Sequence, residues 1–481
     1  MSASGDITTG TAFRGLQAIW LIVSALILVG VGLMIEASPI AAGICLAAGC
    51  AGLLFMMHPL KAAMAFIVLK GITDGFWFVK VGVMGFELSL QRITGVLFPS
   101  LGLAALLTLW MKDKLPRLPL SSLLLCFSCL AAVSLLRSPI PKEALPDVLK
   151  LVGCFVFYYL GFLYFTGEQR LQLFSKWYVV FGLFPFLSVI LQQAGVIDLL
   201  AWGVTQSQVS WMGGEAVRRY AGIYSDAATT SIFLLVSLAL IFAAITHERR
   251  ALVGRFYLIL CAFYMYALVI SSFRIVWAAL FVQVMLWFYT SRSKKTFLLL
   301  MLASCLLALY SYDEIYRVLD LRVLLQAEGL SGKMGFWIIL LRIFLAGDWT
   351  TRLFGQGFMA NADILRNTRG AEIAGQSYSF SEGWGGKAHS DIIEFLTDIG
   401  IVGLLLYLAI LWILGRRMWQ LRKRTRDEFV QLLTRAWLCI FSTYLLYSAI
   451  GNSSRYPALT WPMWFLAGGI LRREGASRDR G

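Results

Sequence analysis

Long apolar segments separated by short polar or basic breaks run along the whole chain. An apolar helix of about 20 residues crosses the roughly 30 Å hydrocarbon core of a bilayer, so each such segment predicts one membrane span. The predicted spans cover residues 15–35, 40–57, 61–79, 91–111, 119–136, 147–166, 172–196, 227–246, 256–272, 274–290, 296–311, 391–414, 431–450 and 458–471. The turn from Ser271 to Arg274 could instead lie inside one broken helix, so the pattern predicts about 12–14 spans.

This periodicity predicts an all-α integral membrane protein, a polytopic helical bundle that forms one membrane domain over residues 1–481. The composition agrees, because 59% of the residues are hydrophobic, 14% are charged and the mean hydropathy is +0.74. Soluble domains carry roughly 25% charged residues, so an ordinary soluble protein is excluded.

The basic residues predict the orientation of the bundle. Short loops rich in Lys and Arg stay in the cytoplasm. The strong basic breaks all fall on one side of the alternating spans, at 112–117, 247–255, 292–295, 416–424 and 472–473. Both termini are therefore expected inside, with segments 197–226 and 312–390 outside. Anionic lipid headgroups at the inner surface account for the net charge of +15, and no nucleic-acid partner is needed.

The eight cysteines all fall in apolar segments and indicate small packing residues. Cys126 and Cys129 have the spacing of a metal or redox motif. They lie in the middle of a predicted span, without a second pair or a nearby histidine, so no metal site is expected there.

The external loop 312–390 is the longest polar segment, and it is too short and too rich in glycine to form a large core of its own. Within it, residues 334–346 are apolar but too few to span the bilayer. They predict a helix that lies in the interface or re-enters it above a cavity. The glycines around this helix suit a chain-shaped ligand.

Several of the cations on the predicted outer face sit at helix ends that could face a cavity, and the candidates are Arg218, Arg219, Arg274, Lys333 and Arg342. Guanidinium groups that converge at a membrane surface can bind the oxygens of a lipid-linked diphosphate. Each of them could instead reach out to lipid headgroups, and Arg342, inside an apolar helix, fits that alternative best. Arg219 and Arg274 sit in short connections where topology requires no charge.

His389 is one of three histidines, and it stands where the external loop meets an apolar helix. Because a histidine side chain can titrate near neutral pH, His389 is the candidate general base, with a hydrogen-bonded structural histidine as the alternative. Ser390 can cap the helix. Asp391, Glu394 and Asp398 share one helix face and could orient the imidazole, or could simply complement the helix dipole.

The segment from His389 to Leu405 resembles the signature of the O-antigen ligase and O-antigen polymerase superfamily, in which a His-Asn pair opens a helix and an acidic-x-Gly-x-x-Gly step follows. Three further segments resemble elements of that family: residues 219–224 its Arg-x-x-Gly-x-Phe motif, residues 272–274 its Ser-x-Arg hairpin, and residues 332–357 its outer loop. The resemblance covers roughly residues 190–415. Ser390 replaces the usual Asn, and Lys333 stands where many members carry Arg.

The resemblance implies a glycosyltransferase of C-type architecture in a bacterial inner membrane, with its active site on the extracytoplasmic face. The implied donor is a glycan on undecaprenyl diphosphate, and the acceptor is a sugar hydroxyl. Arg219 and Arg274, with Arg218 and with Lys333 or Arg342, would hold the diphosphate, and His389 would be the base of an inverting reaction without metal or cofactor.

Three functions stay open on the sequence. The chain is expected to polymerise lipid-linked repeat units into O-antigen or exopolysaccharide, with a chain-length regulator as a further candidate partner. The first alternative is a ligase that transfers the glycan to lipid A core. The second is a flippase or transporter, which would need ionisable residues near the bilayer midplane, whereas Lys150, Lys176 and Arg435 lie near predicted span ends.

Overall fold

The computed structural model describes the chain in segments. They are residues 58–76, 80–83, 86–111, 116, 118–165, 167–196, 209–212, 215–218, 220–224, 227–248, 250–271, 274–290, 330–367, 372–373, 376–377 and 388–478. The predicted spans 15–35, 40–57 and 296–311 lie outside them.

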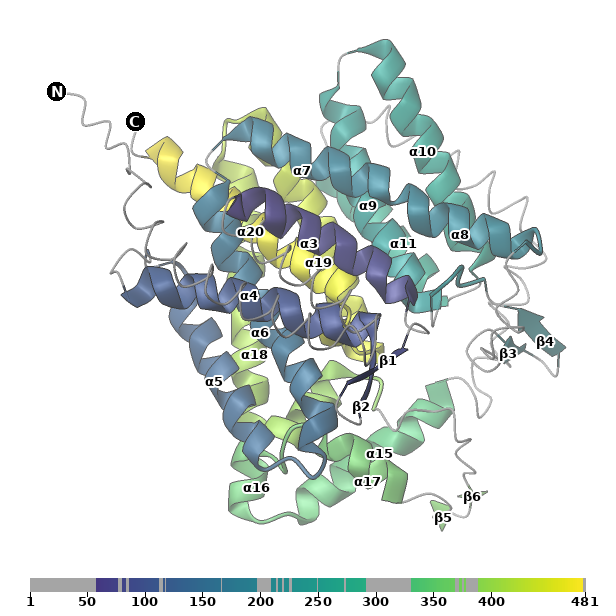
Figure 1. Ribbon diagram of the computed structural model, residues 1–481, viewed down its shortest axis with the longest axis vertical. Coiled ribbons are helices and arrows are strands. Elements are labelled where there is room, and N and C mark those ends of the chain that lie inside the picture. The colour runs from purple at the N-terminus through teal and green to yellow at the C-terminus, as the bar shows by residue number, and fades with distance from the viewer. Residues whose placement is uncertain are drawn as a thin grey trace, which may run out of the picture.

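Helices make up most of the described chain (Figure 1). They are α3 (Pro59–Thr73), α4 (Leu90–Met111), α5 (Ser121–Leu136), α6 (Pro141–Tyr164), α7 (Glu168–Phe181), α8 (Leu183–Gln193), α9 (Ala227–His247), α10 (Ala251–Ile270), α11 (Arg274–Thr290), α15 (Leu330–Ala346), α16 (Trp349–Phe354), α17 (Ala360–Asn367), α18 (Asp391–Arg424), α19 (Glu428–Ile450) and α20 (Pro457–Arg478), with short 3-10 turns η1 (Asp74–Phe76) and η2 (Ser453–Arg455). Each predicted span within the described residues overlaps a helix or, for 172–196, the pair α7 and α8.

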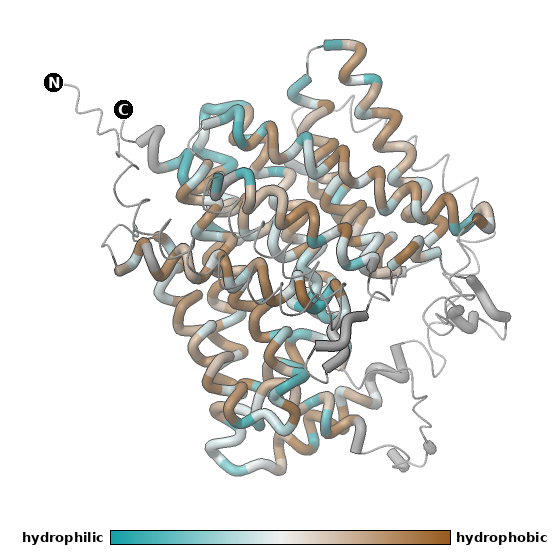
Figure 2. Tube along the Cα trace, viewed as in Figure 1, coloured by the Kyte–Doolittle hydropathy of each residue, from teal (hydrophilic) through white to brown (hydrophobic). Residues whose placement is uncertain are grey.

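Seven helical segments of the described chain are long and apolar enough to cross a membrane, with α7 and α8 counted together. Three shorter apolar helices accompany them, in α5, α11 and α15. Figure 2 shows hydrophobic residues along most of these helices and hydrophilic residues near many of their ends. The protein is therefore a multi-pass, all-helical membrane protein.

Helix α9 lies inside the bundle and is buried on every side from Ala227 to Ala243. Helices α6 and α20 pack closely against each other. A Cβ atom on Gly161 would lie 2.0 Å from the carbonyl oxygen of Phe465, and one on Gly468 would lie 2.1 Å from that of Tyr158. These two glycines let the helix backbones touch, as small residues do between membrane helices.

Three short antiparallel hairpins connect helices: β1 (Lys80–Val83) with β2 (Phe86–Ser89), β3 (Val209–Met212) with β4 (Glu215–Arg218), and β5 (Glu372–Ile373) with β6 (Gln376–Ser377). They fall in connections that the sequence places on the outer side. The predicted span 61–79 therefore ends early, because α3 stops at Thr73 and the chain turns through η1 toward the first hairpin.

The apolar segment 334–346 is helical, as predicted, and forms part of α15. Phe336, Ile339 and Leu340 of α15 pack on Leu365 of α17 and on Ala388, forming a small apolar cluster separate from the main core. Figure 1 places α15, α16 and α17 together at one end of the bundle, where α18 begins. This end contains the candidate site.

Candidate functional site

Helix α18 bends sharply at Gly400, whose φ of 73° and ψ of −174° are not helical. The rings of Phe395 and Tyr407 lie 4.6 Å apart between centroids. Twelve residues of straight helix would separate them by about 18 Å along the axis. The span predicted as continuous over 391–414 is therefore a short first segment, a break, and a long second segment.

The break frees backbone carbonyls, which then accept hydrogen bonds from the outer loop. The Thr397 carbonyl accepts from Gln356 N–H at 2.9 Å, and the Asp398 carbonyl accepts from Gly357 N–H at 3.1 Å and from the Ser134 hydroxyl at 3.0 Å. A Cβ on Gly355 would lie 2.3 Å from the Asp398 carbonyl oxygen. The Gly355-Gln356-Gly357 motif thus docks directly on the broken helix.

The Asp398 side chain fixes the same loop. Its carboxylate accepts hydrogen bonds from Met359 N–H at 2.8 Å, from Asn361 N–H at 3.0 Å and from the Asn361 amide at 2.7 Å. These donors lie at the start of α17, where free N–H groups favour an anion. Asp398 and Gly400, the first acidic and glycine residues of the acidic-x-Gly-x-x-Gly motif, therefore lie where the preceding loop packs against α18.

Asp391 is buried at the first residue of α18 and binds the connection between α19 and α20. Its carboxylate accepts from the Ser448 hydroxyl at 2.6 Å, the Ser453 hydroxyl at 2.6 Å, the Ser454 hydroxyl at 2.7 Å and Ser454 N–H at 3.0 Å. A buried carboxylate is stable only when hydrogen-bond donors replace the water that it has lost, and here four donors do so.

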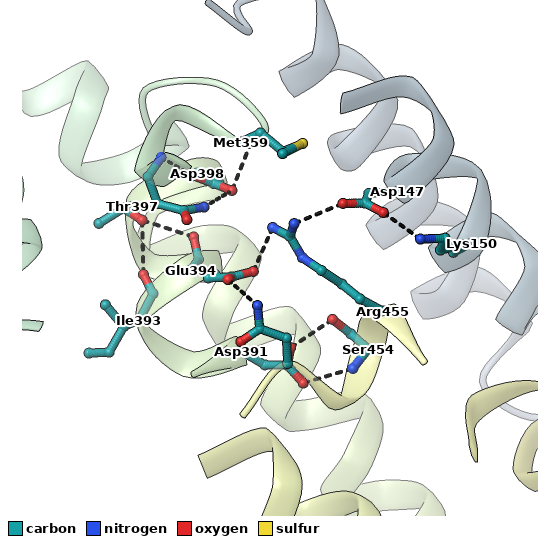
Figure 3. Close-up of polar contacts among 12 residues, drawn as sticks. Asp147, Lys150, Met359, Asp391, Ile393, Glu394, Thr397, Asp398, Ser454 and Arg455 are labelled. Carbon is teal, nitrogen blue, oxygen red and sulfur yellow. Dashed lines mark hydrogen bonds and ion pairs between the residues drawn. The ribbon is translucent and has the colours of Figure 1, made fainter. Parts of the chain in front are cut away.

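Arg455 connects two helices through buried ion pairs (Figure 3). Its guanidinium lies 2.6 Å from a Glu394 oxygen of α18 and 2.8 Å from an Asp147 oxygen of α6. The other Asp147 oxygen lies 2.7 Å from Lys150 Nζ, and Asn452 donates to Glu394 at 2.6 Å. Burial alone would lower the pKa of Arg455, but the carboxylates of Glu394 and Asp147 outweigh it and raise the pKa above its ordinary value.

Asp147 and Arg455 were not among the residues that the sequence singled out. Arg455 lies in a short connection on the predicted outer side, where topology requires no charge. The same argument that selected Arg219 and Arg274 would have selected it. Nothing in the sequence distinguishes Asp147 as a candidate site residue, because acidic residues are common near the ends of membrane spans.

His389 is half-buried and has a left-handed backbone, with φ of 54°. The residues on both sides of it are tied down: Trp337 Nε1 donates to the Ala388 carbonyl at 2.7 Å, and Asp391 N–H donates to the Gly451 carbonyl at 3.1 Å. Ser390 is the N-cap residue of α18, although its side chain makes no capping hydrogen bond in the described structure. The backbone at His389 therefore lies where α15, α18 and the α19–α20 connection meet.

The predicted cations are described to different extents. Arg342 is exposed on α15. Arg218 ends β4, Arg274 begins α11 and Lys333 lies in the first turn of α15, but their side chains, and all of Arg219, lie outside the described structure.

The segments that bear the two principal arginines nevertheless attach to one turn of α9. The Thr230 hydroxyl donates to the Ala221 carbonyl at 2.6 Å, two residues after the first arginine. The Ser231 hydroxyl donates to the Ser271 hydroxyl at 3.1 Å, three residues before the second. Consecutive residues of α9 thus hold both elements at the same end of the bundle.

Among the described residues, no group of three or more His, Cys, Asp or Glu side chains could hold a metal ion. The carboxylates near His389 are instead occupied by serine hydroxyls, amides and Arg455. In comparisons with known proteins, no family model and no curated protein matches the chain.

Proposed function

We propose that the protein is a membrane glycosyltransferase that polymerises oligosaccharide repeat units carried on undecaprenyl diphosphate. The observation that carries the proposal is the fixed backbone of His389, held at a φ of 54° between two anchored neighbours at the end of a broken helix. A non-glycine residue in this conformation costs about 1 kcal/mol or more and persists where the surroundings impose it.

The proposed mechanism needs a base and a group of fixed cations. His389 takes the proton of the acceptor hydroxyl, and that oxygen attacks the anomeric carbon of the donor. The bond to the diphosphate breaks on the opposite face, so the anomeric centre inverts. Arg219 and Arg274 stabilise the negative charge that develops on the departing diphosphate. The attachment of both arginine-bearing segments to one turn of α9 supports this arrangement.

Two alternatives share some of the supporting features. A ligase would use the same donor chemistry and differ only in its acceptor, lipid A core. A flippase or transporter would also fit a broken helix and buried charges, which many transporters contain. It would not need a histidine fixed beside the outer loop, so polymer formation distinguishes it from the proposed enzyme.

The first experiment complements a deletion strain and examines its surface glycan. The strain receives wild-type protein, His389→Ala, or the matched controls His58→Ala and His247→Ala. We expect both controls to restore long chains and His389→Ala to leave single repeat units. Loss of all glycan from lipid A would identify a ligase instead, and normal chains with His389→Ala would remove the proposed base.

The second experiment uses purified protein and a lipid-linked oligosaccharide. Polymer should form in a reaction that contains EDTA, because guanidinium groups take the role that a divalent cation has in many glycosyltransferases. Turnover that stops with EDTA and returns with magnesium would contradict this mechanism.

A further inference from the structure

A second group of cations lies beside the candidate site, where α3, α4 and α6 meet. Lys70, in the last turn of α3, and Lys150, on α6, both reach Gly95 of α4. A Cβ atom on Gly95 would lie 3.7 Å from Lys70 Cε, 3.8 Å from Lys70 Nζ and 3.8 Å from Lys150 Cε. The two ammonium-bearing ends therefore approach each other across a position that has no side chain.

The carboxylates near these lysines are already engaged. Lys70 Nζ pairs with Asp74 and donates to the Gln91 carbonyl at 2.9 Å. Lys150 Nζ pairs with Asp147 at 2.7 Å, but Asp147 also pairs with Arg455 at 2.8 Å. Asp147 would keep a partner without Lys150, so neutralising that carboxylate does not require this lysine.

Both lysines keep donor capacity. An ammonium group has three N–H donors, of which Lys70 uses two and Lys150 uses one with described partners. The side chain of Lys70 is 1% exposed, whereas that of Lys150 is 18% exposed and is the most accessible member of the network. Like charges that meet in a buried place favour an anion between them.

The position of these lysines indicates which anion. A Cβ on Gly75, just beyond α3, would lie 2.8 Å from Ile223 Cδ1 and 3.7 Å from Tyr224 Cε1. The end of α3 thus packs on the segment that follows Arg219. Under the function proposed above, this segment belongs to the diphosphate site, so the end of α3 lies beside an element of that site.

We propose that Lys70 and Lys150 form a phosphate-binding site across Gly95, which takes a phosphate group of a polyprenyl diphosphate. The choice of ligand rests on the function proposed above, while the site itself rests on the geometry of the lysines. Lysine binds phosphate as a compact point charge with three donors, which suits two ammonium groups that approach from different helices.

The test measures binding of polyprenyl diphosphate to purified protein, without turnover. Lys150→Gln should weaken binding about ten-fold, as expected for one lost charge-assisted hydrogen bond. Gly95→Leu, which keeps every charge but puts a larger side chain between the two lysines, should weaken it similarly. Lys61→Gln, an exposed lysine of the same α3 helix, and Gly95→Ala, whose Cβ fits at ordinary contact distances, are the controls and should bind as wild type does.

A third variant neutralises both members of the buried ion pair between Lys70 and Asp74, so that neither charge remains without its partner. Lys70→Gln combined with Asp74→Asn should also weaken binding, while the melting temperature reports whether the fold survives. If binding is unchanged in Lys150→Gln and Gly95→Leu, the site does not exist.

Competition with inorganic pyrophosphate and with phosphatidylglycerol vesicles identifies the source of the phosphate. Equal Lys150-dependent binding of phosphatidylglycerol would overturn the assignment to the polyprenyl diphosphate.

The outcome is separable from that of the proposed function. If the wild-type protein forms polymer and Lys150→Gln binds the lipid as the wild type does, the phosphate site is refuted and the proposed polymerase function stands. Lys150-dependent binding of polyprenyl diphosphate without any polymer would support the site and refute the polymerase.

Discussion

At the scale of single residues, Arg455 joins two helices through buried ion pairs. It neutralises Glu394 on α18 and Asp147 on α6, and its side chain is 7% exposed. Removing one member of a buried ion pair is costly, because the remaining charge stays in a low dielectric. Arg455 therefore stabilises the end of the bundle that bears His389.

Arg455→Met should lower the stability of the solubilised protein by about 3 kcal/mol, seen as a lower melting temperature. Combining it with Glu394→Gln should recover part of the loss, because the double variant no longer contains the buried carboxylate charge that Arg455 neutralised. Arg424→Met, at an exposed position of α18, is the control and should change little. A simple sum of the two single effects would show that the guanidinium and Glu394 do not interact.

The three acidic residues of α18 show what can be predicted at this scale. Their spacing predicted that Asp391, Glu394 and Asp398 share one face of the helix that enters the membrane, and in the structure all three are buried. Their partners could not be predicted, because Ser448 and Ser453 lie more than fifty residues along the chain and Asn361 belongs to the loop before the helix. Whether any of them orients His389 stays a prediction.

At the scale of elements, the break in α18 is the feature that positions the outer loop. Gly400 has a φ of 73°, and a Cβ there would lie 2.3 Å from the Leu353 carbonyl oxygen. A left-handed conformation costs a non-glycine residue roughly 1–2 kcal/mol, and the overlap adds to it. Gly400 therefore combines two requirements that only glycine meets.

Gly400→Ala should destabilise the protein by at least ~2 kcal/mol and loosen the loop from Gly355 to Asn361, measured as a lower melting temperature and faster proteolysis of that loop. Gly254→Ala is a matched control in α10, because no described atom lies within 4 Å of the Cβ position there. Equal melting temperatures for the two variants would contradict the role given to the break.

Apolar length predicted the helices well, since hydrophobic segments bounded by charges need little tertiary information. It did not predict the break at Gly400, because a glycine within an apolar run is common in membrane helices. The hairpins were not predicted: residues 80–89 contain both apolar and polar positions, and they follow a span that was predicted to run to residue 79, whereas α3 ends at Thr73.

At the scale of the whole molecule, the charges are segregated between two ends of the bundle. Helix α18 begins with Asp391, Glu394 and Asp398 and ends with Arg422, Lys423 and Arg424. At the basic end, Arg473 of α20 pairs with Asp427 at 3.0 Å, so the ends of α18 and α20 lie together. The positive-inside rule assigns this end to the cytoplasm and the end with His389 to the outer face.

Reporter fusions test this orientation and, with it, the compartment of the proposed reaction. Alkaline phosphatase fused after Gly347, between α15 and α16, should be active, because the enzyme folds only outside the cytoplasm. The same fusion after Thr425, between α18 and α19, should be inactive, and a green fluorescent protein fusion there should fluoresce. The reverse pattern would place His389 in the cytoplasm. A lipid-linked repeat unit already moved across the membrane could then not reach it, so the fusions test the polymerase proposal without any assay of polymer.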